Sequence, residues 1–218
     1  MFSMEIKDIL ASSASICTVL QYLAGVLVCR QYIKNGTTGD SSALSFVTCL
    51  MSCYLWWTYG MLIKDFFIVY VNLFGALLQV YNIIIFLIYS IKKSTTVRQV
   101  AAALVFILVI FIYSAFLQQD KTVLVKQVGF LSCTLTVLFF ASPLFLLAHV
   151  IKVRSTESLP FPVIMASMIV SCQWFAYGCL INDHFIQVPN FMGCVLSGFQ
   201  LSLFLIYPNK QSVEAYFI

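Results

Sequence analysis

The sequence predicts an all-α membrane protein in which seven transmembrane helices form two parallel three-helix bundles joined by one linker helix. Its composition, the spacing of its charges and an internal repeat lead to this prediction. Of the 218 residues, 61% are hydrophobic and only 9% are charged, whereas a soluble domain carries about 25% charged residues. A chain this apolar is expected to use lipid as its solvent. The net charge of +4 gives no reason to expect a nucleic-acid partner.

Seven stretches without Lys, Arg, Asp or Glu are long enough to cross a bilayer, which takes about 20 apolar residues. They are 9–29, 41–63, 66–91, 99–119, 127–151, 158–182 and 184–209. The connections between them are short, so no separate soluble domain is expected. Asn35-Gly36, in the first connection, predicts a turn. None of the eight cysteines forms a CxxC pair or has companion histidines, so we expect neither a metal site nor a cofactor.

The placement of Lys and Arg predicts the orientation of the chain, because cytoplasmic loops carry the excess of positive charge. An N-terminus on the extracellular or lumenal side leaves four of these residues outside and places the other eight in the cytosol. The eight are Arg30, Lys34, Lys92, Lys93, Arg98, Lys152, Arg154 and Lys210. The N-terminal residues lack the basic region of a signal peptide, so we expect the first helix to be retained.

The second half of the chain repeats the first at an offset of 118 residues, since 174 − 56 = 118 for two of the tryptophans. The informative pairs are Trp56 and Trp174, Asp65 and Asp183, Asn72 and Asn190, and Gly75 and Gly193. Three helices reverse the direction of the chain across the bilayer, and the unmatched fourth helix restores it, so both repeats point the same way. We therefore expect a first repeat (9–91), a linker helix (99–119), a second repeat (127–209) and a cytosolic tail (210–218).

Two copies of one motif connect the chain to a known family. The copies read Trp56-x-x-Tyr59-Gly60 then Asn72-x-x-Gly75, and Trp174-x-x-Tyr177-Gly178 then Pro189-Asn190-x-x-Gly193, with Ala141-Ser142-Pro143 and Ser158-Leu159-Pro160-Phe161 as further marks. With these motifs the chain resembles the SWEET (MtN3/saliva) family of sugar transporters over nearly its whole length. The resemblance implies parallel repeats related by an axis along the membrane normal, with each bundle packing its helices in the order 1-3-2.

The resemblance also implies what such a protein does. It implies bidirectional, uncoupled transport of mono- or disaccharides by alternating access, rather than an enzyme activity. It further implies a location in the plasma membrane or the Golgi, and a possible homo-oligomer.

Four residues are the predicted substrate contacts. Asn72 and Asn190 lie mid-segment at equivalent places, and a carboxamide offers sugar hydroxyls both donors and an acceptor. Both match the paired substrate asparagines of the family. Trp174 matches its pocket tryptophan, whose ring can stack on the C–H face of a sugar, and Trp56 is its repeat mate. Two facing indoles narrow a pocket, which favours monosaccharides such as glucose.

A gate and four hinge positions follow from the same resemblance. Tyr59, Lys64 and Asp183 match the extracellular gate, where a hydroxyl and an ammonium can both bond one carboxylate. The family places a proline in the first two helices of each repeat, and Pro143 and Pro160 match these in the second repeat. Gly25 and Ser45 hold the corresponding positions in the first repeat, so the two halves are expected to bend unequally.

Two other function classes share some of these features. A seven-helix receptor has the same helix number and orientation, but it needs no three-helix repeat and usually has longer inner loops. A proton-coupled carrier of the PQ-loop type is expected to have a Pro-Gln pair and a buried acid, and this sequence has neither. An enzyme would need a nucleophile and a base, but the two histidines, His149 and His184, lie at membrane edges.

Overall fold

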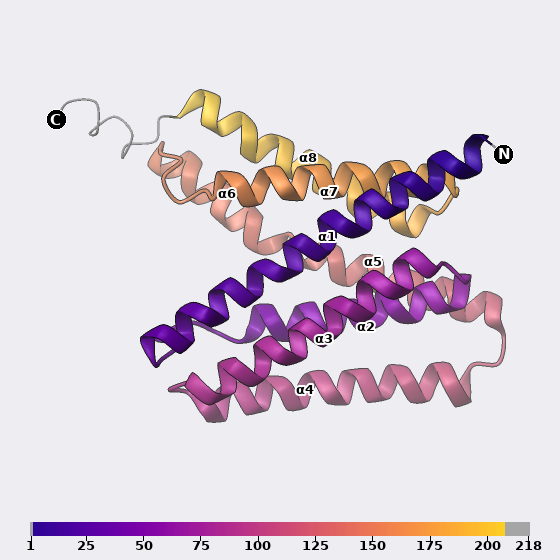
Figure 1. The fold of residues 1–218 in the computed structure, drawn as a ribbon, viewed down its shortest axis with the longest axis horizontal. Helices are drawn as coiled ribbons and strands as arrows, with labels where there is room; N and C mark the ends of the chain where they lie inside the picture. The colour runs from indigo at the N-terminus through magenta and orange to yellow at the C-terminus, as the bar shows by residue number, and fades with distance from the viewer. Residues whose placement is uncertain (1, 208–218) are drawn as a thin grey trace. The chain divides into compact units, whose positions relative to one another are not determined.

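The structure is a computed structural model that describes residues 2–207, with side chains described from residue 5 onward. The predicted tail at 210–218, Lys210 and the end of the seventh predicted stretch lie outside the described residues. All regular elements in the described range are helical (Figure 1). They are α1 (Phe2–Asn35), α2 (Leu44–Ile63), α3 (Phe66–Tyr89), α4 (Lys93–Ile112), the π-helical turn η1 (Tyr113–Leu117), α5 (Lys121–Phe139), α6 (Ala141–Val153), α7 (Phe161–Leu180) and α8 (His184–Ile206).

Within the described residues, seven helical segments are long and apolar enough to span a bilayer. The number is seven because α4 continues through η1 as Lys93–Leu117, and α5 and α6 together form Lys121–Val153. The predicted all-α class and the predicted number of spans are therefore confirmed.

α1, α4 and α5 begin before the charge-free stretches from which they were predicted, whereas α2, α3, α7 and α8 lie within theirs. α1 begins at Phe2 rather than at residue 9, and α4 begins at Lys93 rather than at residue 99. A charged residue ends an apolar stretch of the sequence, but it does not end the helix, whose backbone groups stay hydrogen-bonded to one another throughout the bilayer. The π-helical turn at the end of α4 has no counterpart in the prediction.

The span predicted as one helix over 127–151 is broken in the middle. α5 ends at Phe139 and α6 begins at Ala141, and Pro143 is the third residue of α6. Proline has no N–H to donate to the carbonyl four residues earlier, and its ring crowds that carbonyl. At the break, the backbone N–H of Phe140 donates to Val137 O, three residues earlier, at 3.0 Å rather than to the carbonyl four residues earlier. The break follows from the proline, which the apolar pattern alone does not register.

Identical tight turns connect α2 to α3 and α7 to α8. Lys64 and Asn182 have the left-handed φ angles of 60° and 55° that end the first helix of each pair. Asp65 and Asp183 follow, and each carboxylate accepts hydrogen bonds from the N–H groups two and three residues later, at 2.9–3.3 Å. Such a carboxylate N-cap satisfies the donors that a helix start leaves free. The repeat seen in the sequence is thus also a repeat in backbone geometry.

The connections at the other ends of these helices also match. Gly36 has a φ of 68°, which confirms the predicted turn. The backbone N–H of Thr38 donates to Tyr89 O at 3.1 Å. At the positions 118 residues later, Thr156 Oγ1 donates to Tyr207 O at 3.4 Å. Both threonines are buried, so each links the start of one helix pair to its end.

The chain divides into two compact units, which are described separately here. One unit is Thr18–Ser132, and the other combines Met1–Cys17 with Cys133–Ile218, so the boundaries fall inside α1 and α5. Figure 1 shows α2 beside α3 in the first unit and α7 beside α8 in the second. Phe86 is packed edge-on by Tyr32 in the first unit, and Phe204 by Phe161 in the second. Phe86 and Phe204 are 118 residues apart, but their ring partners come from positions that the repeat does not pair.

Candidate functional site

Asn72 and Asn190, the predicted sugar contacts, make the same hydrogen bond in α3 and α8. Nδ2 of Asn72 donates to Ile68 O at 2.9 Å, and Nδ2 of Asn190 donates to Ile186 O at 2.8 Å. Each bond reaches back four residues and fixes the orientation of the carboxamide on its helix. One donor of each amide is therefore used within the helix. The carbonyl oxygen and the second N–H remain outside the helical ladder and are the groups suited to a sugar hydroxyl.

The glycine three residues after each asparagine marks a close approach between helices. A Cβ added to Gly75 would lie 2.5 Å from the Tyr22 ring and 2.9 Å from Cys53 Sγ. A Cβ added to Gly193 would lie 2.5 Å from Ser171 Oγ. Real Cβ atoms do not approach other atoms this closely, so an alanine at either position would force a neighbouring side chain to shift. The Asn-x-x-Gly motif is thus an asparagine held next to a helix crossing.

The tryptophan of each repeat packs against a tyrosine one turn later. Trp56 and Tyr59 meet edge to face with ring centroids 5.7 Å apart, and Trp174 and Tyr177 do the same at 5.6 Å. Both tyrosines are fully buried, and Trp174 is 9% exposed, whereas Trp56 is more accessible. Edge-to-face contact with a buried ring limits the rotation of each indole. Two indoles held in this way are suitable stacking surfaces for a sugar.

The glycine after each of these tyrosines lets the next helix turn back closely. A Cβ added to Gly60 would lie 3.0 Å from Ile68, and one added to Gly178 would lie 3.1 Å from Ile186. Ile68 and Ile186 are also the residues whose carbonyls bind Asn72 and Asn190. The Tyr-Gly pair therefore helps to position the asparagine on the following helix.

The three predicted gate residues are distributed over both units. Tyr59 is buried, and Lys64 is exposed at the end of α2, so both belong to the unit Thr18–Ser132. Asp183 belongs to the other unit, where its Oδ1 accepts both capping hydrogen bonds at the start of α8. A role in capping through Oδ1 is compatible with a gate contact through the same carboxylate. The gate itself stays a prediction.

The four predicted hinge positions differ in their local structure. Pro143 lies just after the break between α5 and α6, whereas Pro160 is the N-cap of α7 and stands before that helix. Ser45 is the second residue of α2. Gly25 lies inside the unbroken helix α1, where an added Cβ would come within 2.6 Å of Asn82 Nδ2. Among the four, a helix break accompanies Pro143, and Gly25 serves a close packing contact.

Two residues near these sites were not singled out by the sequence analysis. Tyr22 Oη donates to Asn72 Oδ1 at 3.5 Å, and Lys7 Nζ lies 6.0 Å from the centroid of the Tyr177 ring, at a distance typical of a cation–π contact. At the 118-residue offset Tyr22 corresponds to Phe140. The hydroxyl that only Tyr22 carries is the feature of the sequence that could have identified it. Lys7 had no repeat signal, because residue 125 is a valine.

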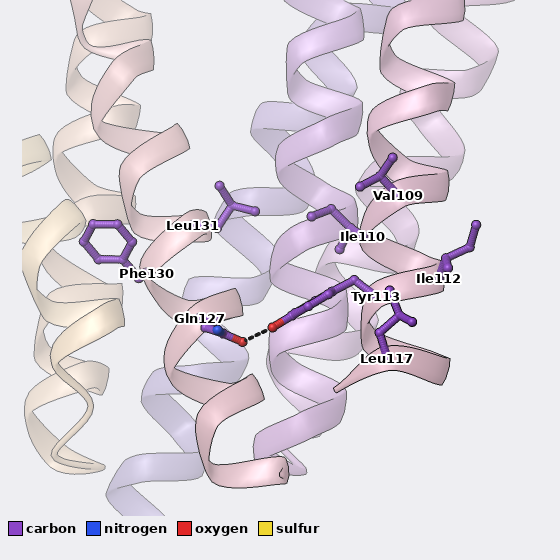
Figure 2. Close-up of a pocket in the computed structure, with 8 residues that line it drawn as sticks. All are labelled: Val109, Ile110, Ile112, Tyr113, Leu117, Gln127, Phe130 and Leu131. Carbon is purple, nitrogen blue, oxygen red and sulfur yellow. Dashed lines mark hydrogen bonds between the residues drawn. The ribbon is translucent and has the colours of Figure 1, made fainter. Parts of the chain in front are cut away.

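A cavity of about 520 Å³ lies between the α4–η1 segment and α5 (Figure 2). Its lining residues are Val109, Ile110, Ile112, Tyr113, Leu117, Gln127, Phe130 and Leu131. Figure 2 shows Tyr113 and Gln127 pointing toward one another, and their hydrogen bond measures 2.6 Å. The remaining lining is apolar, so this cavity offers few partners for the hydroxyls of a sugar. It is therefore not the candidate transport site.

Comparison with known proteins places the chain among transporters. The profile of a family described as sugar efflux transporters for intercellular exchange matches residues 8–94 and 126–212. The sugar transporter SWEET1 of Drosophila pseudoobscura pseudoobscura is 44% identical over 204 residues, which cover 93% of this chain and 90% of that protein. The bidirectional sugar transporter SWEET2a of Sorghum bicolor is 31% identical over 192 residues, covering 85% and 78%.

A solved structure has the same fold. The structure of a eukaryotic SWEET transporter superimposes with a TM-score of 0.82 at 24% sequence identity, covering 92% of this chain and 97% of that chain. This similarity is consistent with the predicted arrangement of three, one and three helices. The two segments matched by the family profile include residues 9–91 and 127–209 in full and leave out residues 95–125 between them. On these grounds the chain belongs to the SWEET (MtN3/saliva) family.

Proposed function

We propose that this protein carries sugars across a membrane as a bidirectional, uncoupled uniporter that works by alternating access, with monosaccharides such as glucose as its main substrates. The proposal rests on family membership together with one structural observation. The tryptophan, the asparagine and the capping aspartate have the same local geometry in both repeats. Two matching sets of groups, one per repeat, suit a carrier that presents a single site to each side in turn.

In this proposal Asn72, Asn190, Trp174 and Trp56 bind the sugar. The carboxamides supply an acceptor and a remaining donor each, and the indoles supply stacking surfaces. Tyr59, Lys64 and Asp183 close the extracellular side. Exposed ion pairs contribute only about 0–1 kcal/mol, a strength that suits contacts that break in every transport cycle.

The distribution of acidic groups supports uncoupled transport. Within the described residues, each Asp and Glu lies in a connection or within about two turns of a helix end. A proton-coupled or sodium-coupled carrier is expected to hold an acid or an ion site within the membrane. The groups proposed here to bind substrate are neutral, which suits a neutral sugar.

The arrangement in the membrane completes the proposal. The repeats 9–91 and 127–209 act as two parallel bundles joined by the linker helix 99–119, with the N-terminus extracellular or lumenal and the C-terminus cytosolic. We place the protein in the plasma membrane or the Golgi, as a homo-oligomer. Eight of the twelve Lys and Arg residues lie on the proposed cytosolic side, at helix ends, in connections or in the predicted tail, which supports this orientation.

Uptake by the purified protein in liposomes tests the function. Labelled glucose, fructose, galactose and sucrose are compared in influx and efflux, with empty liposomes as the control. We expect glucose to move down its gradient in both directions and to reach the same steady state with and without a proton uncoupler. A steady state above the outside concentration that collapses with the uncoupler would contradict uniport, and uptake of none of the four sugars would contradict the proposed substrate class.

A further inference from the structure

The two asparagines differ in what their carbonyl oxygens contact. Asn72 is 8% exposed, and its Oδ1 accepts a hydrogen bond from Tyr22 Oη at 3.5 Å. The same Tyr22 hydroxyl accepts a bond from Cys53 Sγ at 3.4 Å. Asn190 has no such neighbour: within residues 5–207, its Oδ1 accepts no hydrogen bond. Asn72 is therefore oriented at both ends of its carboxamide, and Asn190 at one end.

The difference arises from one atom at equivalent positions of the two repeats. Tyr22 and Phe140 are 118 residues apart, as are Cys53 and Ser171. The glycine after each asparagine is packed against the same two positions: Gly75 against Tyr22 and Cys53, and Gly193 against Ser171, with Phe140 at 3.6 Å from an added Cβ. The two aromatic rings therefore occupy corresponding places. What distinguishes them is the Tyr22 hydroxyl.

We propose that Tyr22 is a positioning residue of the sugar site, and that its hydroxyl occupies the Asn72 acceptor until a sugar hydroxyl replaces it. This inference rests on the proposed function, because it assumes that Asn72 contacts the sugar. An O–H···O hydrogen bond is usually about 2.7–2.8 Å long, so a 3.5 Å contact is weak and easily exchanged. In the empty carrier it still prevents a buried carbonyl oxygen from lacking a partner.

This role makes the two halves of the site unequal. The Asn190 oxygen is ready to accept from a sugar, whereas the Asn72 oxygen must first release Tyr22. Because the sugar replaces the Tyr22 hydrogen bond to Asn72 with its own, the free energy of sugar binding is less favourable. The activation barrier to sugar release is lower for the same reason. Tyr22 therefore lowers the affinity for sugar and raises the turnover rate, which suits a carrier that must release its substrate.

The test compares Tyr22→Phe with Phe140→Tyr and with the double variant. Tyr22→Phe gives position 22 the residue that already stands at the equivalent position 140, so the fold is expected to tolerate it. It leaves the Asn72 oxygen without a partner in the empty carrier. Glucose should then bind more tightly, with KM lower by about threefold to tenfold and kcat lower as well. Phe140→Tyr adds a hydroxyl near Asn190 and should raise KM.

Initial rates of labelled glucose uptake into proteoliposomes give KM and kcat separately. Tyr32→Phe is the matched control, because it removes a hydroxyl from the same helix, α1, where the ring packs on Phe86. The double variant moves the hydroxyl from one repeat to the other and should return KM toward the value of the unmodified protein. A Tyr22→Phe protein with unchanged or raised KM overturns the positioning role and leaves the proposed function intact. A fall in kcat alone indicates packing only and also overturns it. No glucose uptake by the unmodified protein overturns both proposals.

Discussion

The first helix of each repeat shows how two copies of one design differ. α1 runs unbroken through Gly25, whereas the equivalent helix of the second repeat is divided into α5 and α6 ahead of Pro143. The capped turns that follow, at Asp65 and Asp183, have the same geometry in both copies. The capped turns between paired helices are thus present in both repeats. The helix break ahead of Pro143 and the hydroxyl of Tyr22 are each present in one repeat only. The second repeat has the interrupted first helix, and the first repeat has the more fully bonded asparagine.

The largest effect is expected from the asparagines, which test whether both repeats contribute equally. Asn72→Ala and Asn190→Ala each remove a hydrogen-bonding partner of a buried sugar hydroxyl, at about 1–3 kcal/mol, so uptake should fall by at least about fivefold. Glucose uptake into proteoliposomes measures this, with membrane insertion checked separately. Asn35→Ala, at the last residue of α1, is the control and should transport normally. If one of the two variants keeps full uptake, the sugar is bound by a single repeat.

The next largest effect is a difference in stability between Gly75→Ala and Gly193→Ala, which depends on how easily the neighbouring side chain can move. Gly75→Ala forces a Cβ against the rigid Tyr22 ring, and overpacking of this kind costs about 1–3 kcal/mol. Gly193→Ala meets Ser171 Oγ, and this small side chain can rotate away, so the loss should be smaller. The midpoint of thermal unfolding of the purified protein measures both. Adding Ser171→Ala to the Gly193→Ala protein should restore its midpoint of thermal unfolding. An equal loss of stability in the two glycine variants would mean that the helix crossings are equally tight.

A moderate effect on turnover is expected from the helix break. Pro143→Ala restores a backbone N–H at that position, so α5 and α6 can join into one helix. Turnover of glucose should slow several-fold while KM stays unchanged, because the substituted residue bends a helix and binds no sugar. Pro160→Ala is the control, since an N-cap residue donates no N–H to the helical ladder. Equal slowing by both variants would place the moving element outside the break.

The smallest effect is a change in selectivity between sugar sizes. Trp56→Ala should enlarge the site and raise the ratio of sucrose to glucose uptake measured within one preparation. Trp57→Ala is the matched control, because the neighbouring indole packs on Tyr54 and is not assigned to the site. Trp174→Ala should weaken glucose transport more strongly, because this indole is the more deeply buried of the pair. An unchanged ratio for Trp56→Ala would indicate that Trp56 contacts lipid or another helix.

The sequence by itself determined the helical class, the number of spans and the repeat. Each of these depends on local chemistry: the bilayer requires long apolar helices, and equivalent residues 118 positions apart can be read directly. It also predicted the residues proposed for the site, Asn72, Asn190, Trp56 and Trp174, because they are polar or aromatic groups repeated in one register. It did not predict where the helices begin and end, since α1, α4 and α5 begin before the charges that bound their apolar stretches and the other four spans lie within theirs.

Only the tertiary structure decided how those residues are held. The contact of Tyr22 with Asn72 and the close packing of Gly75 against Tyr22 and Cys53 both depend on interatomic distances between helices. Periodicity places a residue on a helix, but it does not specify which atoms of a neighbouring helix come within hydrogen-bond distance. Gly25 is the clearest case: its role as a hinge stays a prediction, and its close packing against Asn82 is visible only in the structure. The physical reason is that close packing, unlike hydropathy, is a property of pairs of residues far apart in the chain.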